Sequence, residues 1–496
     1  MVDSLIVRGP RAREGVLQSV WAVLEQLLWI MFLGLLIVSS FIPGRIDHPQ
    51  WVQLSIAFLV LALLALPFGL GRMHHVSRND VIKPIIILLT ALGWVALVAN
   101  IAIESPFHQK VYPLAGRPDW FAAEFVWAVL PNAASQVVMR DAMMLSVFTT
   151  VVILCRSRSR LKVLMLVFSA LTLAHCLVSL AAWQASTHLV DVQQIDGHFS
   201  AMRGLFVNRN HFASFLIIGS LGSWIALFYG IHKLNGQPLS VWIARLGLSA
   251  LALHVLLLGL VFFCVVMSES RAGFATFLLV FLLLVMRAIP HQSTSQSNNQ
   301  NDKHNVRRKH RRLLSPRVLV SLFFVLLALL AVLLYADGLG GRLATMQGLL
   351  GERPLQWWIT TQAIMDQPWV GYGAGSYSVV FEYYRQGFEL RDVIFDQAHN
   401  DWIQLVLEQG IIGLVLWLSF FYVVLSSLLR YLRYTPSRYR RAVLYAVSAI
   451  VMAAVLQSMV DFNLQIVRIR LLFFVSLAVV FVLAQNDHQH TKHRSA

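Results

Sequence analysis

The stretch RSRSRLKVLMLVFSALTLAHCLVSLAAW, residues 156–183, decides the fold class. Residues 163–183 contain no Asp, Glu, Lys or Arg and are long enough to cross the hydrocarbon core of a bilayer, which takes about 20 apolar residues. The basic run 156–162 in front of them is typical of a cytoplasmic loop. The stretch therefore predicts a transmembrane helix with a basic cytoplasmic flank.

The composition extends this interpretation to the whole chain. Hydrophobic residues make up 57% of the sequence and charged residues 13%, whereas soluble domains carry about 25% charged residues. The net charge of +16 does not indicate nucleic-acid binding, because the basic residues form short clusters between apolar runs. The first apolar run, 16–42, is too long for the core of a cleaved signal peptide and is expected to be a retained helix.

We therefore predict an all-α polytopic membrane protein with about twelve transmembrane helices. The expected spans are 16–42, 51–71, 84–103, 142–155, 163–183, 211–230, 247–268, 272–286, 318–336, 410–429, 442–460 and 471–485. With both termini cytoplasmic, 27 of the 40 Lys and Arg residues fall on cytoplasmic segments, as the positive-inside rule requires. The runs 156–162 and 307–312 are the strongest markers of that orientation.

The spans divide the chain into three parts. Residues 1–336 hold helices one to nine with a polar cytoplasmic linker at 287–317, residues 337–409 form a large periplasmic loop, and residues 410–496 hold the last three helices and a cytoplasmic tail. The loop lies between spans nine and ten and is expected to be partly helical. An amphipathic pattern, with Trp357 and Trp358 suited to a membrane interface, predicts a helix over 352–368. A second short helix is expected over 376–385.

Four outer segments are candidates for function: 104–141, 184–210, 268–273 and 337–409. Ionisable residues are scarce inside the spans, where they usually mark transport pathways. Glu25, His175 and His254 are the notable ones, and packing or interhelical hydrogen bonding is the expected role of each. The chemistry of the protein is therefore expected at its outer face.

Three arginines on the outer segments suit an anionic ligand. Arg203 and Arg209 precede the sixth span, and Arg271 lies in the short turn SESRAG, 268–273. A guanidinium is a planar, permanently charged fork that matches phosphate oxygens better than an ammonium does. The alternatives are anchoring to lipid head groups or a salt bridge, for which Glu269 is a candidate partner of Arg271.

The stretch FDQAHNDWIQLVLEQGIIG, 395–413, places a histidine between two aspartates in front of an apolar run. His399 suits a general base, since an unperturbed imidazole has a pKa of about 6.5. Asp396 or Asp401 is expected to orient its ring. The alternatives are helix capping and a metal site, although the spacing Asp396-x-x-His399-x-Asp401 matches no strong metal signature. The three cysteines, at 155, 176 and 264, form no metal or disulfide framework.

These segments also resemble a known family. The residues from His399 to Gly413 fit the pattern H-[NSQ]-x9-G-x-x-G, which resembles the signature of bacterial O-antigen ligases, polytopic inner-membrane glycosyltransferases. RGLFVNRNHFA (203–213), SESRAG, the run from Arg353 to GYGAGSY and VDFNLQI (460–466) are similar to further motifs of that family, in the same order. The resemblance covers about residues 200–470.

The resemblance implies transfer of a glycan from an undecaprenyl-diphosphate carrier to an acceptor hydroxyl on lipid A-core or another glycan. It needs neither a metal nor another cofactor and takes place at the periplasmic face of the bacterial inner membrane. Arg203 and Arg271 would bind the diphosphate, and His399 would deprotonate or position the acceptor hydroxyl. The supporting candidates are Asn208, Asn210, Arg209, Arg353, Asn400, Asp396, Asp401 and Asp461.

Three alternative functions remain open from the sequence. The same superfamily includes repeat-unit polymerases of O-antigen or exopolysaccharide and enzymes that glycosylate protein hydroxyls. A transporter of lipid-linked glycans is disfavoured by the scarcity of charge in the spans. The chain also departs from the family after DFNLQI, where Arg468 and Arg470 replace small and proline residues. These two cations either add phosphate contacts or anchor the last span.

Overall fold

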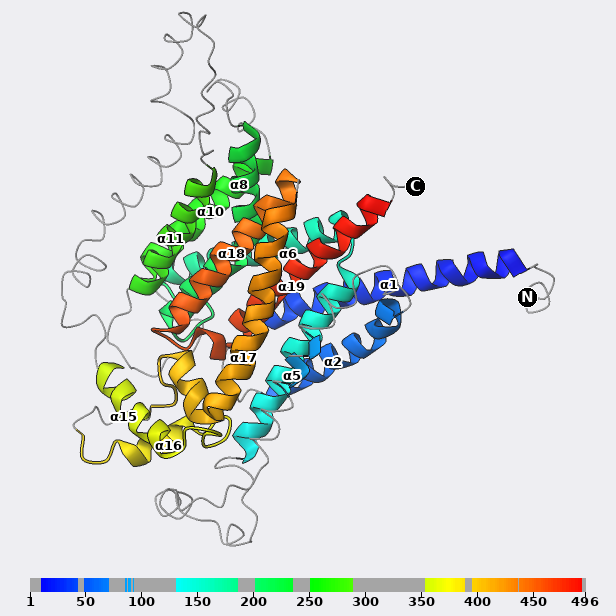
Figure 1. Ribbon diagram of the computed structural model, residues 1–496. Helices are drawn as coiled ribbons and strands as arrows, with labels where there is room; N and C mark the ends of the chain where they lie inside the picture. Colours follow the sequence, from blue (N-terminus) through cyan, green and yellow to red (C-terminus); the bar gives the residue numbers. More distant parts are fainter. Residues whose placement is uncertain are drawn as a thin grey trace, which may run out of the picture.

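The computed structural model describes residues 10–42, 49–70, 85–86, 88–90, 92, 131–185, 201–234, 250–288, 353–388, 395–435 and 437–492. Within these ranges the protein is helical and contains no strand (Figure 1). The helices are α1 (Pro10–Phe41), α2 (Pro49–Leu70), α5 (Pro131–Leu154), α6 (Arg158–Gln184), α7 (Arg209–Gly219), α8 (Leu221–Leu234), α10 (Ala250–Met267), α11 (Arg271–Ala288), α15 (Arg353–Asp366), α16 (Tyr377–Tyr384), α17 (Asp401–Tyr434), α18 (Arg438–Ser458), the 3₁₀ helix η7 (Asn463–Gln465) and α19 (Val467–Lys492).

The protein is a multi-pass membrane protein. In the described ranges, seven helices are long and apolar enough to cross a bilayer, or eight if α7 and α8 together form one bent span. The expected span 318–336, most of 84–103, the outer segment 104–130 and most of the linker 287–317 lie outside the described residues. The total of about twelve spans therefore stays a prediction.

Helix α19 lies at the centre of the bundle, between α5, α17 and α18 (Figure 1). Every residue from Val467 to Leu483 is buried. A helix that is buried on all sides is enclosed by other helices and does not face lipid. By contrast, α1 and α2 expose large apolar side chains such as Ile30 and Leu63, as lipid-facing helices do.

The predicted span 211–230 is not one straight helix. It is divided into α7 and α8, which are bent by 46° at Ser220. The two glycines beside the bend lie tightly against α6: a Cβ on Gly219 would be 2.6 Å from Thr172 Oγ1, and one on Gly222 would be 2.5 Å from the Met165 carbonyl oxygen. The close approach of α6 at both glycines accounts for the position of the bend.

Helix α17 begins at Asp401 and is kinked at Gly410, where the sequence predicted a span to start. Gly410 has φ +68° and ψ −175°. The kink releases the backbone groups on both sides, and these pair with the preceding loop: Ile411 N donates to Pro368 O over 2.8 Å, and Tyr372 N donates to Leu407 O over 2.9 Å. The glycine of the motif therefore fastens the loop to the membrane helix.

The two expected helices of the large loop are confirmed as α15 and α16. They lie together at the Asp401 end of α17 (Figure 1), with Ile359, Tyr377 and Phe381 in a small apolar core of their own. The two tryptophans differ in role. Trp358 is 51% exposed, whereas the Trp357 indole is half-buried and donates a hydrogen bond to the carbonyl of Ala398 over 2.9 Å.

The three ionisable residues inside the spans have packing or hydrogen-bonding roles, as expected. Glu25 accepts a hydrogen bond from Arg160 over 2.6 Å. The His254 ring nitrogen Nδ1 lies 3.0 Å from Ser223 Oγ, and the buried His175 ring packs among aromatic side chains.

Candidate active site

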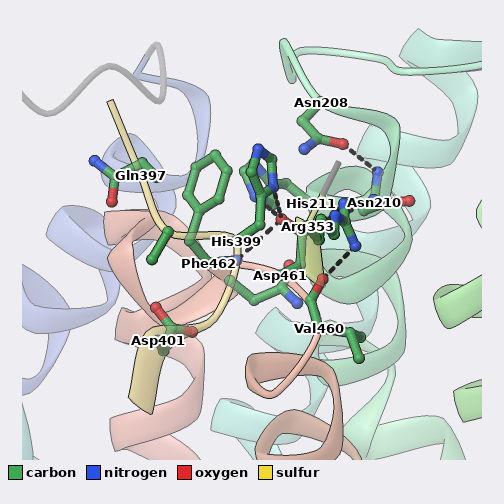
Figure 2. A network of polar contacts seen from close by, with 12 residues as sticks. Asn208, Asn210, His211, Arg353, Gln397, His399, Asp401, Val460, Asp461 and Phe462 are labelled. Carbon is green, nitrogen blue, oxygen red and sulfur yellow. Dashed lines mark hydrogen bonds and ion pairs between the residues drawn. The ribbon is translucent and has the colours of Figure 1, made fainter. Parts of the chain in front are cut away.

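Asp461 is the centre of the polar cluster at the end of the bundle where α18 ends and α7, α11 and α17 begin (Figure 2). Its side chain is 1% exposed. His399 Nδ1 lies 3.1 Å from Oδ1, and the Asn210 amide donates to Oδ2 over 2.6 Å. His211 Nε2 is 3.7 Å from Oδ1, and Arg353 Nη2 is 3.6 Å from Oδ2. One buried carboxylate thus holds four side chains from three parts of the chain.

The partners of Asp461 keep it ionised. Burial alone would raise the pKa of this carboxyl group, because desolvation penalises the charged form. The imidazoles of His211 and His399 outweigh that effect and hold the pKa of Asp461 well below its ordinary value. The carboxylate is therefore negatively charged at neutral pH.

The His399–Asp461 contact orients the histidine ring. Because the carboxylate accepts from Nδ1, the ring takes the tautomer in which Nδ1 carries the proton and Nε2 carries the lone pair. The side chain is 29% exposed, and its ring meets the edge of Phe462 at a centroid distance of 4.9 Å. An accessible, oriented imidazole backed by a carboxylate is the arrangement of a general base.

The backbone around His399 is fixed by α15 and α17. Trp357 donates to the carbonyl of Ala398, and the Gln404 side chain accepts from its N–H over 3.0 Å. Asn400 caps α17, accepting from the backbone N–H groups of Trp402 and Ile403 over 3.0 and 3.1 Å. Between these fixed points His399 has φ +49°, a conformation that non-glycine residues adopt at a cost and that recurs at functional sites.

Asn210 connects Asp461 to the turn that carries Arg271. Its side-chain oxygen accepts from Ser270 Oγ over 2.8 Å, while its amide donates to Asp461. Asn208 caps α7 by accepting from Asn210 N over 2.8 Å. The two predicted asparagines therefore bring the starts of α7 and α11 to the buried carboxylate.

The three predicted arginines lie on segments that meet at this end of the bundle. Met202 N donates to Met267 O over 2.8 Å, which fixes the segment of Arg203 against the end of α10. Arg203 is partly buried, and its Nη1 lies 3.4 Å from the carbonyl of Val207. Arg271 is the first residue of α11 and is half-buried.

Arg209 and Arg353 are both paired with acidic groups. Arg209 Nη1 lies 3.7 Å from Glu269 Oε2, the carboxylate considered above for Arg271. Arg353 donates to the carbonyl of Val460 in addition to its contact with Asp461. Arg353 therefore ties the start of α15 to the end of α18.

The expectation that Asp396 or Asp401 orients His399 is wrong. Asp396 is exposed, and Asp401 Oδ2 accepts from the backbone N–H of Leu464 over 2.9 Å. Asp461, which is 62 residues away in the sequence, takes the orienting position. The sequence does not predict this pair because the two residues are far apart along the chain. It indicates that both segments lie at the same end of the helix bundle, but not which of their side chains are in contact.

His211, which lies directly after Asn210, was not among the site residues predicted from the sequence. A polar residue near the start of an otherwise apolar helix was the available signal.

The two cations after DFNLQI both have partners within the protein. Arg468 donates to the carbonyl of Leu205 over 2.7 Å, and Arg470 lies 2.7 Å from Asp141. These contacts tie the start of the last helix to its neighbours.

No group of three or more His, Cys, Asp or Glu side chains in the described ranges is arranged to hold a metal ion. The three cysteines are free and buried.

Comparison with known proteins identifies the central part of the chain. A family model described as O-Antigen ligase matches residues 254–418, which include Ser270, Arg271, Arg353 and His399. No curated protein matches the chain. The family covers ligases and polymerases and implies glycosyltransferase-like ligase activity on lipid-linked glycans. Residues 254–418 of this multi-pass membrane protein are an O-antigen ligase family domain.

Proposed function

We propose that the protein transfers a glycan from an undecaprenyl-diphosphate carrier to a hydroxyl of lipid A-core or another glycan. The reaction takes place at the periplasmic face of the bacterial inner membrane, with both termini in the cytoplasm. The single observation that supports the proposal most is the His399–Asp461 pair. His399 lies within the matched residues 254–418, and Asp461 lies after them in the sequence.

In this mechanism His399 Nε2 accepts the proton of the acceptor hydroxyl. The acceptor oxygen attacks the anomeric carbon, a new C–O bond forms, and the bond between that carbon and the diphosphate oxygen breaks. Asp461 keeps the ring in the required tautomer and stabilises the imidazolium that results. The released electron pair stays on the undecaprenyl diphosphate.

Arg203 and Arg271 bind the diphosphate and stabilise the charge that grows on it. Guanidinium forks suit this group because they match its oxygens with parallel hydrogen bonds. They supply positive charge at the leaving group, so we propose that the reaction is metal-independent. Asn210 and Arg353 support the site by holding Asp461.

The test is transfer by the purified full-length protein from an undecaprenyl-diphosphate-linked glycan, with EDTA present. We expect transfer to continue in EDTA at an unchanged rate. Complete loss that Mg²⁺ or Mn²⁺ restores would contradict the metal-independent mechanism.

A polymerase uses the same donor and the same chemistry, with a lipid-linked glycan as acceptor. A deletion strain distinguishes the two: full-length polymer left on the lipid carrier indicates a ligase, and single repeat units indicate a polymerase. Protein serine or threonine hydroxyls as acceptors would appear as glycoproteins that are lost in the same strain.

A further inference from the structure

A second polar region lies next to the candidate active site, on the α5 side of α17. A partly open cavity is bounded by α5, α17, η7 and α19. Its polar walls are Arg140, Asp401, Glu408, Gln409, Gln465 and Arg470. Its apolar walls include Trp402, Trp417, Phe421 and Phe474. Lining residues from α17 lie on both sides of Gly410, so the kink of that helix shapes the cavity.

The cavity and the His399–Asp461 pair share two chain segments. Asp401 follows His399 by two residues, and Leu464 follows Asp461 by three. The two segments are joined by the hydrogen bond from Leu464 N to Asp401 Oδ2. In Figure 2 the Asp401 carboxyl lies apart from the cluster around Asp461. A molecule in the cavity would therefore be a close neighbour of the proposed base without contacting the cluster.

Two buried polar atoms of residues that line the cavity have no hydrogen-bond partner within the described residues. They are Asp401 Oδ1 and Arg140 Nε, on residues that are 7% and 6% exposed, and Arg140 Nε lies 3.7 Å from Asp141 Oδ1. Buried polar atoms normally have a hydrogen-bond partner, so an atom without one indicates a bound ligand or water. A hydroxyl group both donates and accepts, so it can pair with either atom.

Both guanidinium groups of the cavity already have partners within the protein. Arg470 lies 2.7 Å from Asp141, and Arg140 lies 3.7 Å from the same carboxylate. Arg140 also donates to the Gln465 side chain over 2.8 Å. A phosphate in this cavity would therefore have to compete with these partners for both cations.

The aromatic walls select among neutral polar ligands. A pyranose ring has C–H faces that pack on aromatic rings and a rim of hydroxyls that bond to planar polar side chains. Trp417 is 5% exposed, and its orientation is fixed by a hydrogen bond to Gln409 over 3.2 Å. The Arg470 guanidinium lies 5.5 Å from its ring centroid. The Trp417 ring is therefore held in place, as a binding surface for a sugar requires.

We propose that this cavity is a sugar-binding subsite that receives one pyranose unit of the glycan substrate. The inference rests on the proposed function for the identity of that substrate, and it extends the site beyond the family domain through Arg140, Gln465 and Arg470.

The test is ligand-observed saturation-transfer NMR on the full-length protein in nanodiscs. The probes are free glucose, galactose, N-acetylglucosamine and rhamnose, with inorganic phosphate titrated as a competitor. We expect saturable signals from the ring C–H protons of at least one sugar, unaffected by phosphate. No signal from any of the four sugars, or displacement of the sugar by phosphate, overturns the proposal.

Two variants locate the binding. Asp401→Asn keeps an oxygen for Leu464 N but replaces the other carboxyl oxygen by an amide nitrogen, and should weaken sugar binding about tenfold, the effect of losing one hydrogen bond. Leu405→Trp fills the cavity without removing a polar group and should abolish binding. The matched control is Val415→Trp on the same helix, where the side chain is 53% exposed. Binding that persists in both cavity variants overturns the proposal.

Kinetics of the same variants show whether the donor or the acceptor supplies the sugar. They also distinguish a failure of the subsite from a failure of the proposed function. A rise in KM confined to the donor assigns the subsite to the donor glycan, and one confined to the acceptor assigns it to the acceptor; no rise in either overturns the subsite. His399→Ala should abolish transfer and keep sugar binding. Sugar binding by a wild-type protein that transfers no glycan supports the subsite and refutes the proposed function. Transfer by a wild-type protein whose sugar binding does not depend on the cavity refutes the subsite and supports the proposed function.

Discussion

The Asn210 amide donates to the Asp461 carboxylate over 2.6 Å, although 251 residues separate them in the sequence. Asn210 precedes the family domain and Asp461 follows it. Through Ser270 on one side and His399 on the other, this bond joins the turn of Arg271 to the proposed base. The site is therefore assembled from three parts of the chain around one buried charge.

Asn210→Ala removes the shortest hydrogen bond to Asp461 and leaves the buried carboxylate with one donor fewer. We expect the free energy of unfolding to fall by about 1–3 kcal/mol, because an unsatisfied buried group keeps its desolvation cost. Thermal unfolding in detergent measures the change. Ser270→Ala, which removes a bond to Asn210 rather than to Asp461, should cost less; an equal or larger cost would contradict the central position of the carboxylate.

Asp461→Asn should slow transfer about a hundredfold while the protein still folds, since an amide no longer fixes the His399 tautomer or stabilises the imidazolium. The measurement is kcat at neutral pH, where the account predicts a larger effect than on the KM of either substrate. A variant with wild-type kcat would show that the carboxylate does not act through His399.

The same pair predicts the pH dependence of stability. The pKa of Asp461 is lower in the folded protein than its ordinary value of 3.8, so the folded state binds fewer protons and the stabilisation is present above that value. It is lost only as the pH falls through the lower, folded-state pKa. The stability difference between the wild type and Asp461→Asn should therefore not weaken from pH 8 to pH 5. A difference that vanishes above pH 5 would contradict the assignment.

Gly410→Ala should disrupt the junction between the large loop and α17. A Cβ there would lie 2.1 Å from the carbonyl oxygen of Trp369, and the backbone has φ +68°. The strain alone costs about 1–3 kcal/mol, and the clash adds to it. Gly259→Ala is the matched control, because a Cβ on that helical glycine meets nothing within 4 Å. Equal melting temperatures for the two variants would show that the kink does not fasten the loop.

Arg203→Lys and Arg271→Lys should each raise the KM for the lipid-diphosphate donor about tenfold, since a point charge replaces a planar fork. Arg385→Lys is the control: this arginine pairs with Glu382 three residues before it, on the loop. Donor kinetics measure the effect. An unchanged donor KM in both variants would remove the two arginines from the diphosphate site.

Much of the architecture could be predicted from the sequence because its signals are local. Apolar runs and basic flanks predicted the described spans, and amphipathic periodicity predicted α15 and α16. The bend at Ser220 was missed, since it depends on how closely α6 packs against two glycines. The segments of Arg203, Arg271 and His399 were also predictable from their residue types, whereas those of Arg353 and Asp461 were indicated by the family resemblance alone.

The pairing within the site could not be predicted. Asp396 and Asp401 are close to His399 in sequence, but the helix start at Asp401 turns its carboxyl toward Leu464. Asp461 reaches the ring only because α18 and α17 end and begin at the same level of the bundle. The partner of Arg470 could not be predicted for the same reason, because Asp141 lies on a helix that is distant in the sequence.

The most direct test of the proposed mechanism is single-turnover transfer by purified His399→Ala, with its melting temperature measured in parallel. We expect wild-type folding and donor binding, with the rate of glycan transfer reduced at least a hundredfold. Transfer at the wild-type rate by this variant would contradict the role of His399 as the general base.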